Sequence, residues 1–138
     1  MALFHTAIMV DDDPITNCLN KAILEEKGLA IKYFTFTHPY NALPFVEHYC
    51  FAQSIGSFLP DLLLLDIKMP VMNGFEFLER LLALPGAENL NGRIFLLTSS
   101  TAQRDIERAK QYSLAGYLEK PLSDTNIQQI INSVRATG

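Results

Sequence analysis

Apolar and polar residues alternate along this chain in blocks that predict strands and helices in turn. Short runs of strand-forming residues predict five strands, at 4–10, 31–36, 62–65, 93–97 and 116–119. Segments with apolar residues at helical spacing follow them, at about 14–27, 39–50, 75–82, 102–112 and 123–134. The runs LLLL and IFLL are uninterrupted, which is typical of strands buried on both faces. The chain is therefore predicted to be an α/β protein with a parallel sheet.

The first predicted helix has clear start and stop signals. Asp13 is a plausible N-cap, Pro14 suits the first turn, and Gly28 ends the segment. Its apolar residues recur at helical spacing and predict the face that packs on the sheet: Ile15, Cys18, Leu19, Ala22 and Ile23. Cys18 is accordingly expected in the core.

Polar residues follow four of the five predicted strands. Ligands of open α/β sheets bind beyond the carboxyl ends of the strands, so these residues are expected to meet at one edge of the sheet. They are Asp11, Asp12 and Asp13 after the first strand, Asp66 after the third, Thr98, Ser99 and Ser100 after the fourth, and Lys120 and Pro121 after the fifth.

This set of side chains favours phosphoryl chemistry. Clustered carboxylates repel one another unless a cation intervenes, and an all-oxygen cluster suits a hard ion such as Mg²⁺. A lysine and a hydroxyl can contact phosphoryl oxygens, and a central aspartate can accept a phosphoryl group as a nucleophile. Each feature alone has an ordinary explanation, such as a helix cap or a surface lysine, but these do not explain their joint occurrence at successive strand ends.

Composition narrows the classes of protein further. The chain has 138 residues, 49% hydrophobic and 19% charged, which fits one globular domain over 1–138. A net charge of −4 argues against non-specific nucleic-acid binding. No apolar run is long enough to span a membrane, and no secretory signal opens the sequence. Two cysteines, Cys18 and Cys50, lack zinc-site spacing and are expected to be reduced thiols, which suits a cytoplasmic location.

Four motifs in order, VDDDP, LLLLDIKMPVMNG, LLTSS and GYLEKP, resemble the response-regulator receiver domain of two-component signalling. The resemblance extends from Phe4 to about Arg135. It implies a doubly wound, flavodoxin-like sheet of five parallel strands in the order 2-1-3-4-5, with helices on both faces. It implies that Asp66 is the phosphoacceptor. Mg²⁺, or Mn²⁺ in its place, would be held by Asp11, Asp12, Asp66 and the backbone carbonyl of Lys68.

The same resemblance assigns a role to four further residues. Lys120 would contact the phosphoryl oxygens, and a cis bond would precede Pro121. Thr98 would be the hydroxyl that moves toward the phosphoryl group, and Tyr117 the aromatic residue that moves with it.

The resemblance also implies a biological setting. The expected phosphodonor is a sensor histidine kinase or a histidine phosphotransfer protein, and the downstream target is a protein that the sequence does not identify. We expect no turnover of an external substrate, no output domain, no direct nucleic-acid or membrane binding, and a monomer or a weak phosphorylation-dependent dimer.

Three other functions were weighed. A haloacid-dehalogenase-like Mg²⁺ phosphatase would use D-x-D-x-(T/V) after the first strand, but Ile15 stands where Thr or Val is required. A pseudo-receiver that binds partners without phosphorylation would not need the complete set of acids, hydroxyl and lysine. A flavin carrier would need a hydroxyl-rich phosphate loop after the first strand. The connections at 50–60 and 85–92 are longer than expected for a receiver domain, and Lys68 and Ser100 occupy variable positions beside the site.

Overall fold

The computed structural model describes residues 2–50, 59–87 and 92–137. Within them, five parallel strands form one sheet in the order β2-β1-β3-β4-β5. The strands are β1 Phe4–Val10, β2 Ala30–Phe36, β3 Asp61–Leu65, β4 Gly92–Thr98 and β5 Gly116–Glu119. This is the predicted doubly wound, flavodoxin-like arrangement.

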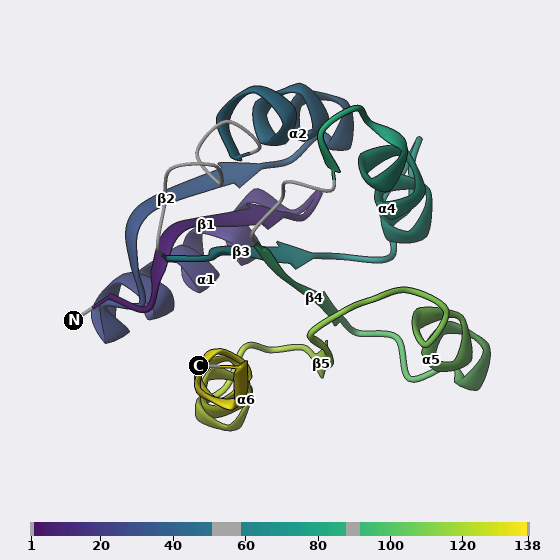
Figure 1. The fold of residues 1–138 in the computed structure, drawn as a ribbon. Helices are drawn as coiled ribbons and strands as arrows, with labels where there is room; N and C mark the ends of the chain where they lie inside the picture. Colours follow the sequence, from purple (N-terminus) through teal and green to yellow (C-terminus); the bar gives the residue numbers. More distant parts are fainter. Residues whose placement is uncertain (1, 51–58, 88–91, 138) are drawn as a thin grey trace.

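Helices cover both faces of the sheet (Figure 1). Their bounds are α1 Pro14–Lys27, α2 Pro39–Phe45, continued as the π-helix η1 Val46–Cys50, α4 Gly74–Ala83, α5 Gln103–Ala109 and α6 Asp124–Thr137. Helices α1 and α6 lie on one face, and α2, α4 and α5 lie on the other. No helix in the described parts of the chain combines the length and apolar character that crossing a bilayer demands.

Strand β3 shows why the LLLL run is uninterrupted. Leu63 and Leu65 pack in the apolar core on the side of α2 and α4, whereas Leu62 and Leu64 pack in the core on the side of α1 and α6. Successive side chains of a strand point to opposite faces, so a strand between two helical layers needs apolar residues at every position. All four leucines are almost inaccessible to solvent.

Helix α1 begins and ends as predicted, but it buries a different face. The Asp13 carboxylate accepts a hydrogen bond from the Ile15 N–H, and Gly28 ends the helix with a left-handed φ of 63°. The expected apolar stripe was wrong, because Ile15 and Leu19 are 69% and 60% exposed and Cys18 is exposed too. The residues that α1 buries are Asn17, Asn20 and Leu24.

The reason for this orientation lies at the strand ends. The first half of α1 packs over the ends of β1 and β2, where backbone carbonyls accept hydrogen bonds from the helix. Asn17 donates hydrogen bonds to two of them, the carbonyls of Asp11 and Phe36. A leucine at this position would remove both bonds. The Phe36 carbonyl would keep the Asp11 N–H as a donor, but the buried Asp11 carbonyl would lose the donor that Asn17 supplies.

Two further expectations differ from the structure or fall outside it. The helix expected at 102–112 is shorter, because α5 ends at Ala109 and Lys110, Gln111 and Tyr112 continue as turns with N–H groups bonded three residues back. The connections expected to be long include 51–58 and 88–91, which lie outside the described residues.

The orientation of α1 predicts opposite outcomes for two leucines of the same helix. Leu24→Ala should lower the free energy of unfolding by about 2–5 kcal/mol, because Leu24 is fully buried. Leu19→Ala should change it by no more than about 0.5 kcal/mol, as is usual for a surface substitution. Urea unfolding of both variants measures the difference, and equal losses would contradict this orientation of α1.

Candidate functional site

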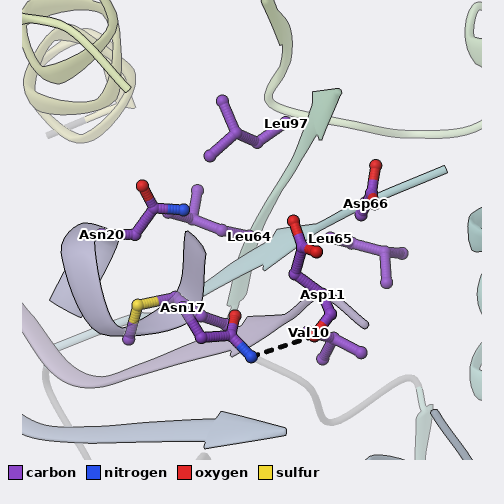
Figure 2. A pocket seen from close by; sticks show the side chains of 9 residues that line it. Val10, Asp11, Asn17, Asn20, Leu64, Leu65, Asp66 and Leu97 are labelled. Carbon is purple, nitrogen blue, oxygen red and sulfur yellow. Dashed lines mark hydrogen bonds between the residues drawn. The ribbon is translucent and has the colours of Figure 1, made fainter. Parts of the chain in front are cut away.

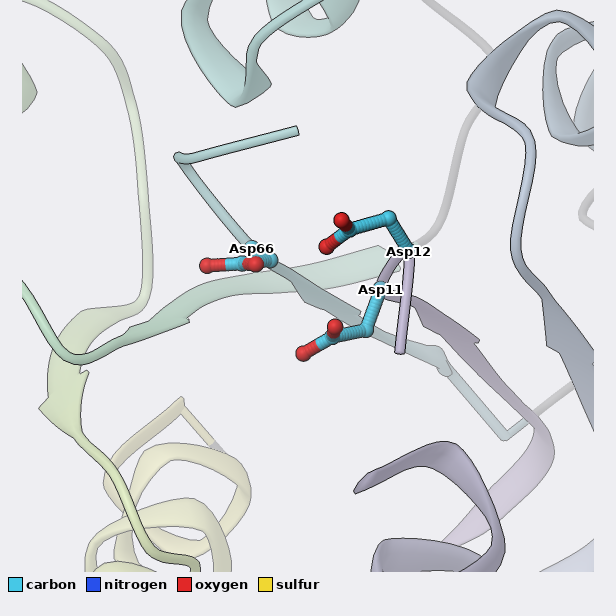
Figure 3. A group of neighbouring side chains, drawn as sticks. All are labelled: Asp11, Asp12 and Asp66. Carbon is cyan, nitrogen blue, oxygen red and sulfur yellow. The ribbon is translucent and has the colours of Figure 1, made fainter. Parts of the chain in front are cut away.

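The pairing of β1 with β3 brings two aspartates to the same edge of the sheet. Val10 and Leu65 are register partners in this parallel pair, so the next residues, Asp11 and Asp66, emerge side by side. The Asp66 N–H donates to the Val10 carbonyl at 3.0 Å, which extends the ladder by one residue, to Asp66. Figure 3 shows Asp11, Asp12 and Asp66 with their carboxylates turned toward the same space.

The three carboxylates form a compact acidic cluster. One oxygen from each of Asp11, Asp12 and Asp66 lies within 4.8 Å of the others. Asp11 and Asp66 are only 4% and 5% exposed, whereas Asp12 is exposed. Burial, and then the negative charge of Asp11, raise the pKa of Asp66 above its ordinary value. A cluster of oxygen donors with excess negative charge, two of its three carboxylates buried, fits a hard divalent ion such as Mg²⁺.

Lys120 supplies the nearest positive charge. Its Nζ donates a hydrogen bond to Asp11 and lies 3.3 Å from Oδ2 of Asp66. Burial opposes the ammonium charge, but the hydrogen bonds and the attraction of the two carboxylates outweigh it and raise the pKa of Lys120. The Lys120–Pro121 peptide bond is cis, as the sequence resemblance implied, and the Lys120 N–H donates to the Thr98 carbonyl at 2.8 Å.

The loop after Asp66 is held close to the strand end. A Cβ at Gly74 would lie 2.4 Å from the backbone oxygen of Asp66, so only glycine fits there. The backbone N–H of Lys68 interacts with the Asp66 carboxylate, and the Lys68 side chain is exposed. Val71 has a φ of 73°, a strained conformation for a β-branched residue, and is 82% exposed beside the site.

Ser100 links the predicted switch residues. Thr98 is fully buried, and its hydroxyl oxygen accepts the Ser100 N–H at 3.2 Å. The Tyr117 hydroxyl donates to the Ser100 carbonyl at 2.9 Å, and the Ser100 hydroxyl donates to the Asp105 carboxylate at 2.6 Å. The sequence prediction marked Ser100 only as a variable position. A hydroxyl five residues before an acid in the first turn of a helix is the sequence signal that could have indicated the bond between Ser100 and Asp105.

The predicted site residues therefore fall into two groups. Asp11, Asp12, Asp66 and Lys120 lie together at the ends of β1, β3 and β5. Thr98 and Tyr117 are joined to each other through Ser100 at the end of β4. Asn17, which supports the Asp11 carbonyl, was missed because its helix was expected to bury an apolar stripe.

Comparison with known proteins identifies the family. A family model described as the response regulator receiver domain matches residues 7–132. This chain belongs to the response-regulator receiver family. It is 34% identical over 131 residues to NarL, the nitrate/nitrite response regulator protein of Escherichia coli strain K12. The aligned segment covers 95% of this chain and 55% of NarL. It thus spans about half the length of that relative.

Other receivers and related proteins are similar over nearly their whole length. An uncharacterized 14.6 kDa protein of Leptolyngbya boryana is 30% identical over 90% of this chain and 85% of that protein. The crystal structure of a response regulator receiver protein from Dyadobacter fermentans DSM 18053 aligns with a TM-score of 0.78 at 27% identity, covering 95% of this chain and 98% of that one. A two component response regulator from Cytophaga hutchinsonii shares the fold, with a TM-score of 0.82 at 24% identity over 96% and 98% of the two chains.

The raised pKa of Asp66 predicts how this receiver's stability depends on pH. A carboxyl whose pKa is higher in the folded state stabilises the fold at a pH below its unfolded pKa of about 4. This contribution is lost as the pH rises through the folded pKa. Asp66→Asn removes the buried charge, so the variant should be more stable than the wild type at pH 7 without Mg²⁺.

Urea unfolding at neutral and acidic pH checks this expectation. The advantage of Asp66→Asn should shrink below about pH 4, where the wild-type carboxyl is protonated. Asp124→Asn is the matched control, because the Asp124 side chain is 92% exposed. An advantage of the same size at both pH values would contradict a charge-based origin.

Proposed function

We propose that this receiver domain accepts a phosphoryl group on Asp66 from the phosphohistidine of a sensor kinase or phosphotransfer protein, with the help of Mg²⁺. The observation that carries the proposal is the position of Asp66, which is buried, clustered with Asp11 and Asp12, and 3.3 Å from the Lys120 ammonium. A nucleophile for phosphoryl transfer needs nearby positive charge. Lys120 supplies one such charge, and the carboxylates of the acidic cluster are ligands for a cation that would add to it.

The residues that would hold the ion are Asp11, Asp12, Asp66 and the backbone carbonyl of Lys68. Bound there, Mg²⁺ would offset the negative charge that develops on the transferred phosphoryl group. Mn²⁺ is also a hard ion that accepts oxygen ligands, so we expect it to substitute. Lys120 already neutralises part of the acidic cluster, and its hydrogen bond to Asp11 keeps its ammonium beside Asp66.

In the proposed reaction, an oxygen of Asp66 attacks the phosphorus in line with the phosphohistidine nitrogen. The new P–O bond forms as the P–N bond breaks, and the electron pair of that bond returns to the imidazole, which takes up a proton. The Lys120 ammonium lies close enough to Asp66 to contact a phosphoryl oxygen and stabilise the spreading charge.

The hydrogen bonds of Ser100 support a switch. A Thr98 hydroxyl that turns to the phosphoryl group gives up the Ser100 N–H, and Ser100 is bonded to both Tyr117 and Asp105. A change at Thr98 therefore reaches the first turn of α5 and the ring on β5. We propose that this shifts the surface of α5, β5 and α6 that binds the downstream protein.

The phosphodonor has to approach over the edge of the sheet that carries Asp66. Ile15 and Leu19 lie exposed on α1, and Leu19 borders a hollow that Lys120, Pro121 and Leu122 also line. This apolar surface beside the site gives the donor protein an area to bind while its phosphohistidine reaches Asp66. We propose a cytoplasmic location with a monomer or a weak phosphorylation-dependent dimer, and no turnover of an external substrate.

The environment of Asp13 weighs against a phosphatase of the haloacid-dehalogenase kind. Such an enzyme would use Asp13 as a general acid, but its carboxylate caps α1 by accepting from the Ile15 N–H and the Thr16 hydroxyl. These hydrogen bonds hold the pKa of Asp13 below its ordinary value, which is the wrong direction for an acid that donates a proton at neutral pH.

Incubation with acetyl phosphate and Mg²⁺ should add one phosphoryl group to the wild-type protein, as measured by intact mass. Asp66→Asn and EDTA should each abolish the gain, because one removes the nucleophile and the other removes the ion. A gain that survives Asp66→Asn would place the modification elsewhere. If neither acetyl phosphate nor beryllofluoride with Mg²⁺ changes the mass or the NMR signals of Tyr117, the pseudo-receiver function is favoured instead.

Lys68 is expected to lengthen the life of the aspartyl phosphate. Its exposed side chain follows Asp66 by two residues, so it can shield the phosphoryl group from attacking water. Lys68→Ala should therefore speed dephosphorylation several-fold without preventing phosphorylation. Loss of the mass gain over time measures the rate, with Lys110→Ala, in the turn after α5, as a control for an exposed lysine. Equal rates for Lys68→Ala and the wild type would rule out this role.

A further inference from the structure

Two buried asparagines of α1 lie against the sheet beneath the acidic cluster. Asn17 and Asn20 are 2% and 6% exposed. The Asn17 side-chain nitrogen donates to the carbonyls of Asp11 and Phe36, each at 3.0 Å. These two bonds use both of its N–H groups and fix the orientation of the amide. Figure 2 shows the nitrogen turned toward the Asp11 backbone and the oxygen turned away from it.

The oxygen of this amide is left without a partner. Oδ1 of Asn17 is buried and accepts no hydrogen bond from the part of the chain that the structure describes. Buried polar atoms in folded proteins are nearly always paired, either with protein groups or with ordered water. An unpaired acceptor on a residue whose other atoms are so well bonded points to a missing donor beside it.

Asn17 also lines a small cavity. It has a volume of about 10 Å³, and its polar lining comes from Asp11, Asn17, Asn20 and Asp66 (Figure 2). Apolar residues form the rest of its lining: Met9, Val10, Leu64, Leu65 and Leu97. One water molecule needs roughly 10–15 Å³ and two to four polar partners, so the cavity matches a single water and nothing larger.

We propose that this cavity binds one internal water molecule, and that Asn17 and this water position Asp11 for Mg²⁺ binding. The water would donate to Oδ1 of Asn17 and to the Asp11 carboxylate, and it would accept from the Asn20 amide. The Asp11 oxygens already accept from the Asp13 N–H and from Lys120, but a carboxylate has about four acceptor sites and so can take a further donor. The consequence for the ion rests on the proposed function.

This arrangement supports Asp11 from the interior of the protein. Asn17 bonds the Asp11 carbonyl directly, and through the water it also reaches the carboxylate. Lys120 and the Asp13 N–H hold the same carboxylate on the other side. Groups that orient a metal ligand in this way typically change metal affinity about 10- to 100-fold when they are replaced. Asn17 would therefore act on Mg²⁺ without touching it.

A high-resolution crystal structure of the Mg²⁺-free wild type tests the water directly. We expect one ordered water within hydrogen-bond distance of Oδ1 of Asn17, and a nuclear Overhauser effect between that water and the Asn17 amide protons. This measurement needs neither a variant nor the ion. A dry cavity would overturn the proposal.

Two leucine variants test the positioning role. Asn17→Leu, similar in size, should weaken Mg²⁺ binding about tenfold or more in calorimetry, because it removes both the bonds to the carbonyls and the acceptor for the water. Asn20→Leu keeps the Asn17 bonds and removes only the donor to the water. It should eject the water and weaken Mg²⁺ binding to a smaller extent, and it remains informative if Asn17→Leu does not fold.

Asn41→Leu, at an exposed position on α2, is the matched control and should bind Mg²⁺ like the wild type. Unchanged affinity in folded Asn17→Leu or Asn20→Leu would overturn the positioning role. If the wild type itself binds no Mg²⁺, the proposed function fails, while the crystal structure still decides whether the cavity holds water.

Discussion

Repulsion between Asp11 and Asp66 is the constraint to which the rest of the site is fitted. Parallel pairing of β1 with β3 forces Asp11 and Asp66 close together, because they directly follow Val10 and Leu65, which are register partners. Lys120 offsets part of the repulsion, yet burial and Asp11 still raise the pKa of Asp66. One ammonium among three carboxylates leaves negative charge uncompensated, and that imbalance suits the site to a divalent cation.

The cost of this imbalance is confined to one edge of the sheet. Two apolar cores, one on each side of the sheet, bury the central strands β1 and β3 along nearly their whole length, so the stabilising burial and the destabilising charges are separated in space. The loop between Asp66 and Gly74 carries a local conformational cost at the same edge of the sheet. It approaches the strand end so closely that no side chain fits at Gly74, and it holds Val71 at a positive φ. Such local strain persists only where the surrounding structure imposes it.

The sequence predicted features that depend on regular periodicity, and it failed where polar contacts override periodicity. Strand β1, strand β5 and the capped ends of α1 matched because local chemistry specifies them. The site residues at strand ends could also be predicted, since topology alone brings those ends together. The buried face of α1 could not be predicted, because the burial of Asn17 depends in part on the Phe36 carbonyl, which lies nineteen residues further along the chain. The role of Ser100 likewise depends on Tyr117, which lies on another strand.

The unusual face of α1 follows from the needs of the site. Turning the helix to bury Ile15 and Leu19 would withdraw Asn17 from the carbonyls of Asp11 and Phe36. Those carbonyls end β1 and β2 directly beside the acidic cluster, so losing the Asn17 hydrogen bonds would loosen Asp11 where its position matters most. Single exposed apolar residues are common on protein surfaces, whereas buried polar groups are nearly always hydrogen-bonded, as the Asp11 carbonyl is through Asn17. The orientation of α1 is thus set by the functional edge of the sheet and not by the hydrophobicity of the helix.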